Sequence, residues 1–363
     1  MIKNLKTKLT SHPLLRRGLG RLLLFCVAAL FFTSCKTAML YTNLDVLRPA
    51  KMEFAPDVEN LLVVNNSKIQ PADWGHTVRS LNGATQTIEV PSDSLALFCL
   101  SVLTEEIEMT DFFVSVDLLL NSINNDRNFA SISPLQKITV KELCDTYDVD
   151  AVLSLDHIVA KSEVQEYYNA DWLQFIAVSA ARYETFWSIH YPNELSTKAV
   201  HFKDSLFWES ESYNRARALE NLPNRQNALI DGALQVGQNS AKRFVPYWEK
   251  EDRYFFNSNN KQMKQGMDSV YVRNWDGALN QWKQFFNSTN NMKLRAEAAN
   301  NMAIASEIIG DYDKALKYAK IAFDIFNSRI LIDYELLVRL SDYRVELNRR
   351  KKEIELLNKQ LGE

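Results

Sequence analysis

The sequence predicts an α+β protein with a small mixed α/β domain, which contains an antiparallel meander, followed by an all-α helical repeat domain. Two long segments with alternating apolar residues, 151–168 and 172–191, meet at a polar turn and indicate the meander. After residue 258 the apolar residues follow the helical period, and one pattern recurs at a spacing of 37 residues. We therefore divide the chain into a targeting segment, a tether, the α/β domain and the helical repeats, at 1–34, 35–57, 58–257 and 258–363.

Strands and helices alternate in the first part of the α/β domain. The apolar run Leu61–Val64 predicts a buried strand. A helix is expected over 92–111, with Ser92 as its N-cap, and a strand is expected over 112–116. Thr139 and Glu142 have the spacing of a capping box, in which each side chain accepts a hydrogen bond from the other residue's main-chain N–H. A second helix is therefore predicted to begin at Thr139.

The meander and a long helix complete the α/β domain. The turn at 192–194 leads from the second long strand into a third, over about 198–209. A helix over 224–247 and a last strand over 254–256 follow. This order of elements resembles the small α/β domain of periplasmic lipoproteins such as the curli-secretion lipoprotein and the amino-terminal domain of TolB. The resemblance rests on element order alone, so it carries over no functional residue.

A helix pair is predicted over 295–327. Gly310 suits the exit of its first helix, because a positive φ costs little only for glycine, and Ala315 lets the two helices approach. This pattern resembles a tetratricopeptide repeat, which implies stacked antiparallel helices with a concave groove. The earlier copy lies 37 residues upstream, where Arg273 replaces the turn glycine.

The last helix carries apolar residues every seven positions, namely Leu340, Leu347, Ile354 and Leu361. Two repeats are fewer than the three that usually bury a continuous core, so the array needs a cap. One interpretation is therefore that this helix caps the repeats. The alternative is a short coiled coil, through which two copies of the chain would associate.

The amino terminus has the features of a secretory signal. Six Lys and Arg residues precede an apolar run over 22–32, and no acidic residue occurs before Asp45. The run is about half of the roughly 20 residues that a membrane-spanning helix needs. Phe32-Thr33-Ser34-Cys35 then resembles the lipobox of bacterial lipoproteins, which implies cleavage before Cys35 and acylation of its thiol, palmitate included.

Charge and composition narrow the location and the class of partner. The whole chain has a net charge of −3, and removal of 1–34 takes away six basic residues and leaves about −9. This balance argues against nucleic-acid binding, which depends on neutralising many phosphates. Attachment to a membrane must then come from the lipid on Cys35. The residues after Cys35 are not acidic, and we expect the outer membrane, with the protein facing the periplasm.

No catalytic motif occurs in the sequence. Walker, GxGxxG, GxSxG and HExxH patterns are missing, so we expect no enzyme, no cofactor and no metal. The alternative is a periplasmic hydrolase whose site is assembled from dispersed residues such as His190, His201 and Asp204. Cys99 and Cys144 lie among apolar residues and are expected to be buried thiols, although an oxidising periplasm permits a disulfide.

The expected function is to recruit or scaffold another envelope protein or peptide through the helical repeats, in assembly or maintenance of the cell envelope. The first helix of each pair lines the groove in tetratricopeptide proteins, which implies Met267 and Tyr271 in the weaker copy and Asn300 and Glu307 in the better one. Two alternatives stay open. In the first, the terminal helix fills this groove. In the second, the protein is an assembly subunit that binds its partner through the α/β domain.

Overall fold

The structure is a computed structural model that describes residues 38–124, 128–194, 197–329 and 333–362. The predicted signal segment 1–34 and the lipidation residue Cys35 lie outside the described residues. The rest falls into two units, which we name the α/β unit (45–250 and 351–362) and the repeat unit (38–44 and 251–350). Three elements have residues in both units, namely β1 (Ala38–Arg48), β9 (Tyr247–Asn257) and α10 (Tyr334–Leu361). The predicted class, α+β, is confirmed.

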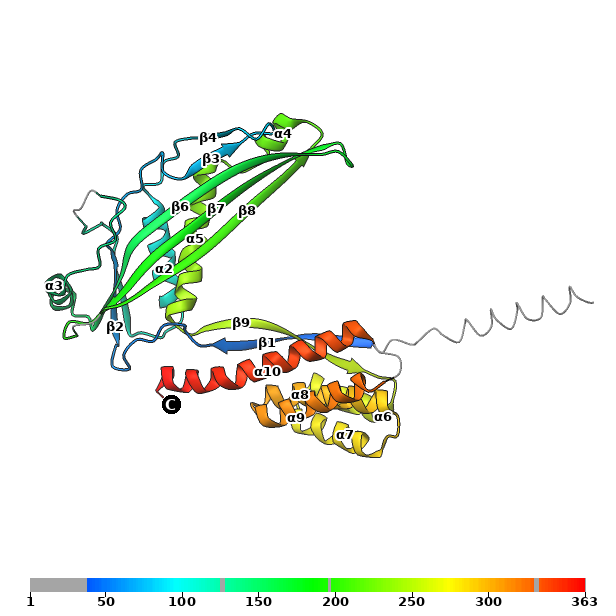
Figure 1. Cartoon of the computed structure of the whole chain (residues 1–363). Helices are drawn as coiled ribbons and strands as arrows, with labels where there is room; N and C mark the ends of the chain where they lie inside the picture. Colours follow the sequence, from blue (N-terminus) through cyan, green and yellow to red (C-terminus); the bar gives the residue numbers. More distant parts are fainter. Residues whose placement is uncertain (1–37, 125–127, 195–196, 330–332, 363) are drawn as a thin grey trace, which may run out of the picture. The chain divides into compact units, whose positions relative to one another are not determined.

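A long central strand organises the sheet of the α/β unit (Figure 1). The strands described are β2 (Asn60–Asn65), β3 (His76–Arg79), β4 (Thr85–Thr87), β5 (Ser115–Leu119), β6 (Ala151–Asn169), β7 (Gln174–His190) and β8 (Lys198–Ser212). One edge of β6 pairs in parallel with β2 near its beginning and with β3 further along. Its other edge pairs antiparallel with β7, which pairs antiparallel with β8. The predicted meander is therefore confirmed.

Helices cover the sheet on two sides. Figure 1 shows α2 (Leu95–Glu108) and α5 (Arg225–Phe244) side by side along one face of the meander. A Cβ atom at Gly237 of α5 would lie 2.4 Å from the carbonyl oxygen of Cys99 in α2, so glycine permits this close crossing. The core between helices and sheet includes Leu153, Tyr183 and Trp187. On the other face, α3 (Lys137–Tyr147) packs over β2 and the first residues of β6.

Several local predictions in the α/β unit are wrong. The helix expected to begin at Thr139 begins at Lys137, and Thr139 lies inside its first turn, so no capping box forms. α2 has Ser94 at its N-cap position instead of Ser92. The short elements β3, β4 and α4 (Arg215–Glu220) were not expected, because segments this short carry little periodicity. The predicted tether over 35–57 is also wrong for Ala38–Arg48, which forms β1 and pairs with β9.

The repeat unit contains the two predicted helix pairs. The first pair is α6 (Lys261–Tyr271) and α7 (Trp275–Ser288), and the second is α8 (Met292–Ile308) and α9 (Tyr312–Asn327). Arg273 and Gly310, 37 residues apart, both have a positive φ, of 56° and 80°. The next residues, Asn274 and Asp311, both cap the following helix by accepting a main-chain hydrogen bond three residues on. The two helix pairs therefore share one turn geometry, in which Arg273 takes the strained conformation that glycine takes in the second copy.

The first half of the terminal helix buries one apolar face within the chain, whereas Leu361 near its end is 46% exposed. In the repeat unit, Leu336, Leu340, Tyr343 and Leu347 of α10 belong to the core formed with the helix pairs. This packing is that of the predicted cap, and it leaves these residues no role in a coiled coil between two copies. None of the described helices combines the length and apolar character that crossing a bilayer requires.

Candidate functional site

The groove predicted in the repeat unit is occupied by the chain itself. The amide of Asn301 in α8 donates to the Phe256 carbonyl at 2.9 Å and accepts from the Phe256 N–H at 2.7 Å, as a neighbouring strand would. Asn300 donates to the Tyr254 carbonyl at 3.3 Å. The carboxyl-terminal half of β9 thus lies along α8, where a partner was expected.

Three of the four predicted groove residues are therefore wrong as contacts for a partner. Asn300, Met267 and Glu307 are only 0%, 2% and 3% exposed. Tyr271 is 64% exposed, but it stands without the other three, so no groove site is formed. The sequence pattern correctly indicated the helices, and it could not show that β9, which precedes them, folds back onto α8.

Glu307 holds the closed repeat unit together. Both of its carboxylate oxygens accept hydrogen bonds from Arg253 of β9, at 2.8 and 2.7 Å, and Tyr343 of α10 donates to it at 2.9 Å. Burial by itself lowers the pKa of Arg253, but the hydrogen bonds and charge of Glu307 outweigh that effect and raise it. Burial and the Glu307 carboxylate raise the pKa of Tyr343. Both carboxylate oxygens of Glu307 are thus bonded to β9 and α10, and the residue has a structural role.

The residues of the alternative hydrolase site are not brought together. Asp204 lies on the helix-covered face of the sheet, where Arg243 and Asn239 of α5 donate to it. His201 lies on the opposite face, 3.2 Å from the Glu184 carboxylate and stacked on Phe186. His190 belongs to a separate buried group of polar side chains. Among the described residues, no hydrogen bond joins any two of these three side chains, as the hydrolase hypothesis requires.

A buried polar network joins β6 and β7, and no motif in the sequence predicts it. Asp156 accepts hydrogen bonds from Ser154 at 2.7 Å, from Asn66 at 2.8 Å and from Ser188 at 2.5 Å. Ser154 also lies 3.0 Å from Nε2 of His190. Asp156 sits at an irregularity in the β6–β7 register, which brings its carboxylate beside Ser154. The sequence signal is the pair Ser154 and Asp156 among the apolar residues that begin β6.

This network contains serine, histidine and aspartate, but its order differs from that of a nucleophilic triad. In a triad the carboxylate orients the imidazole, which takes the proton of the serine. Here the carboxylate accepts a hydrogen bond from the serine directly, and Nδ1 of His190 lies 3.3 Å from the Thr197 hydroxyl. Ser154, Asp156 and His190 are 0%, 1% and 3% exposed, so a substrate has no access to them. The network ties the centre of the sheet together.

Acid is expected to destabilise the protein through His190. Burial lowers the pKa of His190 to about 4, whereas an unfolded histidine titrates near 6.5. Between pH 6.5 and pH 4, His190 is therefore protonated in the unfolded state but neutral in the folded state. The free energy of unfolding falls as the pH approaches 4. Burial lowers the pKa of His76 and His157 in the same sense, whereas burial raises the pKa of Asp156, which opposes the trend.

The measurement is urea unfolding at pH 7 and pH 5 of the native chain and of a His190→Gln variant. The free energy of unfolding of the native chain is expected to fall between pH 7 and pH 5, and the pKa of His190 accounts for about 2 kcal/mol of that fall. The variant is expected to lose about 2 kcal/mol less. Equal losses in both chains contradict this assignment.

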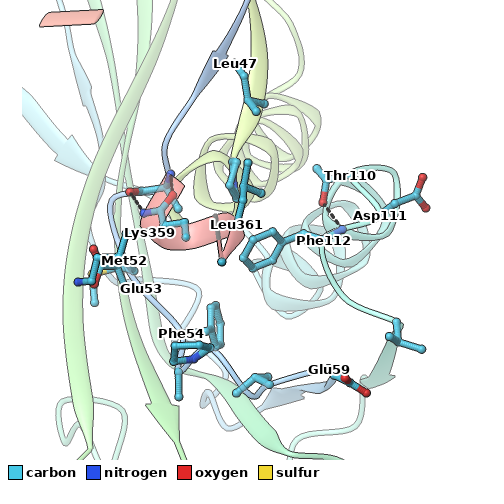
Figure 2. Close-up of a pocket in the computed structure, with 18 of the residues that line it drawn as sticks. Leu47, Met52, Glu53, Phe54, Glu59, Thr110, Asp111, Phe112, Lys359 and Leu361 are labelled. Atoms are coloured by element: carbon cyan, nitrogen blue, oxygen red, sulfur yellow. Dashed lines mark hydrogen bonds and ion pairs between the residues drawn. The ribbon is translucent and has the colours of Figure 1, made fainter. Parts of the chain in front are cut away.

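A cavity of about 790 Å³ in the α/β unit is the strongest candidate for a binding site. Its walls come from four places in the sequence: the segment 50–58, the residues after α2, the beginning of β9 and the end of α10. Figure 2 shows Phe54, Phe112 and Leu361 pointing into the hollow. A volume of this size is typical of pockets that bind ligands.

The wall formed by 50–58 has no regular secondary structure and is held by specific contacts. The main-chain N–H groups of Lys51 and Met52 donate to the Arg243 carbonyl at 3.0 and 2.9 Å. Ala55 N–H donates to the Tyr191 hydroxyl at 2.9 Å. The Lys198 ammonium donates to the Glu53 carbonyl at 3.1 Å. These contacts fix the segment at both ends of the cavity wall.

The end of α10 closes another wall. The side-chain amide of Gln360 makes two hydrogen bonds with the main chain of Ala50, both 2.9 Å long. Lys359 forms an ion pair with Glu53 at 2.7 Å (Figure 2), and Glu353 binds the buried Arg48 at 2.8 Å. The last turns of the chain are thus part of the α/β unit and complete its pocket.

A left-handed residue orients the third wall. Asp111 has a φ of 51°, a conformation that Asp tolerates better than most residues, and it turns the chain from the end of α2 toward β5. Phe112 then faces the cavity, while Phe113 packs edge-on against Phe54 at 5.1 Å. Met109 and Val114 on either side are 70% and 78% exposed.

The chemistry of the pocket favours an apolar ligand. Aromatic and aliphatic side chains line much of it, and its wall also carries charged groups, of which Glu53 and Lys359 form an ion pair and Lys198 donates to the Glu53 carbonyl. Exposed apolar side chains continue the surface beyond the cavity, and Trp248 at its rim is 68% exposed. The carboxylates of Glu59 and Asp111 are also on the rim and are exposed. Such a patch around a cavity marks an interaction site.

The part of the chain that the structure describes contains potential metal ligands and two cysteines. No group of three or more His, Cys, Asp or Glu side chains in this part is arranged to hold a metal ion. Cys99 and Cys144 are buried free thiols, as expected, and burial raises the pKa of both.

Two family models match the sequence. One is described as "Domain of unknown function (DUF8603)" and matches residues 58–256, and the other as "Domain of unknown function (DUF6340)" and matches residues 264–349. No curated protein matches. One similar solved structure, described as "Crystal structure of uncharacterized protein", has 11% identity, covers 51% of this chain and 92% of that chain, and has a TM-score of 0.23. Because the first model spans more than half of the sequence, the chain belongs to the DUF8603 family.

Proposed function

We propose that the chain is a lipid-anchored envelope protein that works by binding, without catalysis, and that its α/β unit holds an apolar segment of another envelope protein. The observation that carries this proposal is the pocket, with its apolar interior and its rim of exposed Met109, Val114 and Trp248. The repeat unit supports it indirectly, because β9 and α10 already occupy the surface where a partner was expected.

The chemistry of the partner follows from the rim. Glu59 and Asp111 add negative charge to a mature chain that is itself acidic, so an apolar segment flanked by basic residues fits best. A protein segment suits the site better than an acyl chain, because the apolar surface extends over the exposed rim as well as the cavity. Two polar side chains of the pocket wall, Gln360 and Lys359, already bond to Ala50 and Glu53.

Replacing Trp248 by aspartate is expected to weaken partner binding by about tenfold or more, because buried aromatic anchors dominate the energy of most interfaces. The measurement is cross-linking in whole envelopes, followed by purification of the full-length chain and quantification of the cross-linked partner. Tyr271→Asp is the matched control, since Tyr271 is exposed to a similar degree, 64% against 68% for Trp248, but lies on α6 of the repeat unit.

Loss of the partner with Tyr271→Asp but not with Trp248→Asp contradicts the proposal, because the helical repeats then bind the partner. Retention of the partner in both variants, with loss after delipidation alone, assigns the interaction to the membrane instead.

The lipid anchor is expected to depend on Cys35. Cells expressing the native chain or Cys35→Ala are grown with radiolabelled palmitate and fractionated on a density gradient. The native chain is expected to be labelled and to sediment with the outer membrane, facing the periplasm, because the acyl chains supply its membrane affinity. The variant is expected to carry no label. Equal labelling of the two chains contradicts the lipoprotein assignment.

A further inference from the structure

The outer edge of β8 presents an unpaired strand. Among the described strands β8 pairs with β7 alone, along all of its 15 residues from Lys198 to Ser212. The main-chain N–H and C=O groups that point away from β7 therefore face no strand within the part of the chain that the structure describes. A long strand edge of this kind is a template for pairing with a further strand.

The charges along this edge are divided by sign. On the face of the sheet opposite α2 and α5, the first half of β8 carries His201 and Lys203, and the second half carries Glu209 and Glu211. Between them Phe207 is 75% exposed. Parallel pairing of two such strands places like charges side by side, whereas antiparallel pairing places the basic half of one against the acidic half of the other.

We propose that two copies of this chain associate through β8, antiparallel to each other, about a two-fold axis at Leu206. In this register Lys203 lies opposite Glu209 of the partner subunit, and His201 lies opposite Glu211 of the partner subunit. Because the interface is symmetric, each of these contacts occurs twice. The two meanders then form one continuous antiparallel sheet, in which the outward main-chain N–H and C=O groups of both β8 strands are hydrogen-bonded.

The charge pattern identifies the occupant as a second copy. A strand from an unrelated protein must supply its own complementary order of charges, whereas β8 is complementary to itself when reversed. The side chains concerned are on the open face of the sheet. Lys203 lies 3.8 Å from Glu184 of β7, and its side chain is 69% exposed, so it reaches a neighbouring strand without repacking the core. This inference is independent of the pocket and of the proposed function.

The test is the molar mass of the full lipidated chain in mild detergent, measured by sedimentation velocity at low and high salt. A dimer is expected at low salt, and Lys203→Glu and Glu209→Lys are each expected to weaken it by about tenfold or more, because like charges then oppose each other twice. The double variant that carries both changes is expected to restore the dimer, since it exchanges the charges and keeps their complementarity.

Two controls separate this surface from others. Arg182→Glu makes a charge reversal on the same face, but on the interior strand β7, and is expected to leave the dimer intact. Val345→Asp alters an exposed residue of α10 and is also expected to have no effect. A monomer for the native chain, a dimer that neither single reversal weakens, or a dimer that only Val345→Asp dissociates overturns the proposal.

Discussion

Replacing Glu307 by alanine is expected to lower the free energy of unfolding of the repeat unit by about 3–5 kcal/mol, which is the cost of breaking a buried ion pair by removing one partner. The Glu307 side chain is fully buried, and the change removes both of its oxygens as acceptors for Arg253, which keeps a longer contact of 3.4 Å to the Glu251 carboxylate. It also removes the acceptor of the Tyr343 hydroxyl. The measurement is thermal and urea unfolding of the full chain.

The double variant Arg253→Met with Glu307→Leu tests the cause of that loss. Apolar replacement of a whole buried ion pair is often close to neutral, so most of the stability is expected to return. Tyr271→Ala, on an exposed position of α6, is expected to change stability by less than about 0.5 kcal/mol. If Glu307→Ala is as mild as Tyr271→Ala, then Glu307 faces a groove after all, and the repeat unit is not sealed as described.

Replacing Asp156 by alanine is expected to destabilise the α/β unit by about 3 kcal/mol or more. The change removes the acceptor of three buried donors, from Ser154, Ser188 and Asn66, of which Ser154 keeps a neighbour in Nε2 of His190 at 3.0 Å. Each buried group left unsatisfied costs about 1–3 kcal/mol. Asp156→Asn is expected to cost clearly less, because the amide oxygen still accepts and Ser188 can accept from the amide nitrogen.

These two variants also distinguish a structural network from a catalytic one. A hydrolytic centre at Ser154 and His190 predicts a well-folded Asp156→Asn chain with a specific loss of hydrolysis. The structural assignment predicts an order of stability, native, then Asn, then Ala, in urea unfolding. An Asp156→Ala chain that unfolds at the same urea concentration as the native chain contradicts it.

Local periodicity predicted the parts of the fold that depend on local sequence. The alternation in 151–191 was sufficient for β6 and β7, because one face of each strand is buried under helices. Gly310 marked the turn of the second helix pair, and Arg273 at the same place in the first pair shows that a non-glycine residue accepts the left-handed conformation there.

The features that determine the candidate site depend on distant segments, so the sequence pattern could not predict them. The hydrogen bonds of Asn301 with Phe256, which close the repeat unit, become visible only in the folded chain. The pocket likewise combines Phe54, Phe112, Trp248 and Leu361, which no local pattern connects. The strand at residues 38–48 pairs with β9, about 200 residues later in the chain, so no local sequence pattern distinguishes it from a tether.

In the proposed function, the partner meets the pocket of the α/β unit and not the helical repeats. The most direct measurement places a photoreactive amino acid at Val114 on the pocket rim, or at Tyr271 on α6, in the full-length chain in living cells. Irradiation is expected to give a discrete adduct from Val114, which Trp248→Asp in the same chain abolishes, and none from Tyr271. An adduct from Tyr271 alone, or a Val114 adduct that Trp248→Asp leaves unchanged, contradicts the claim.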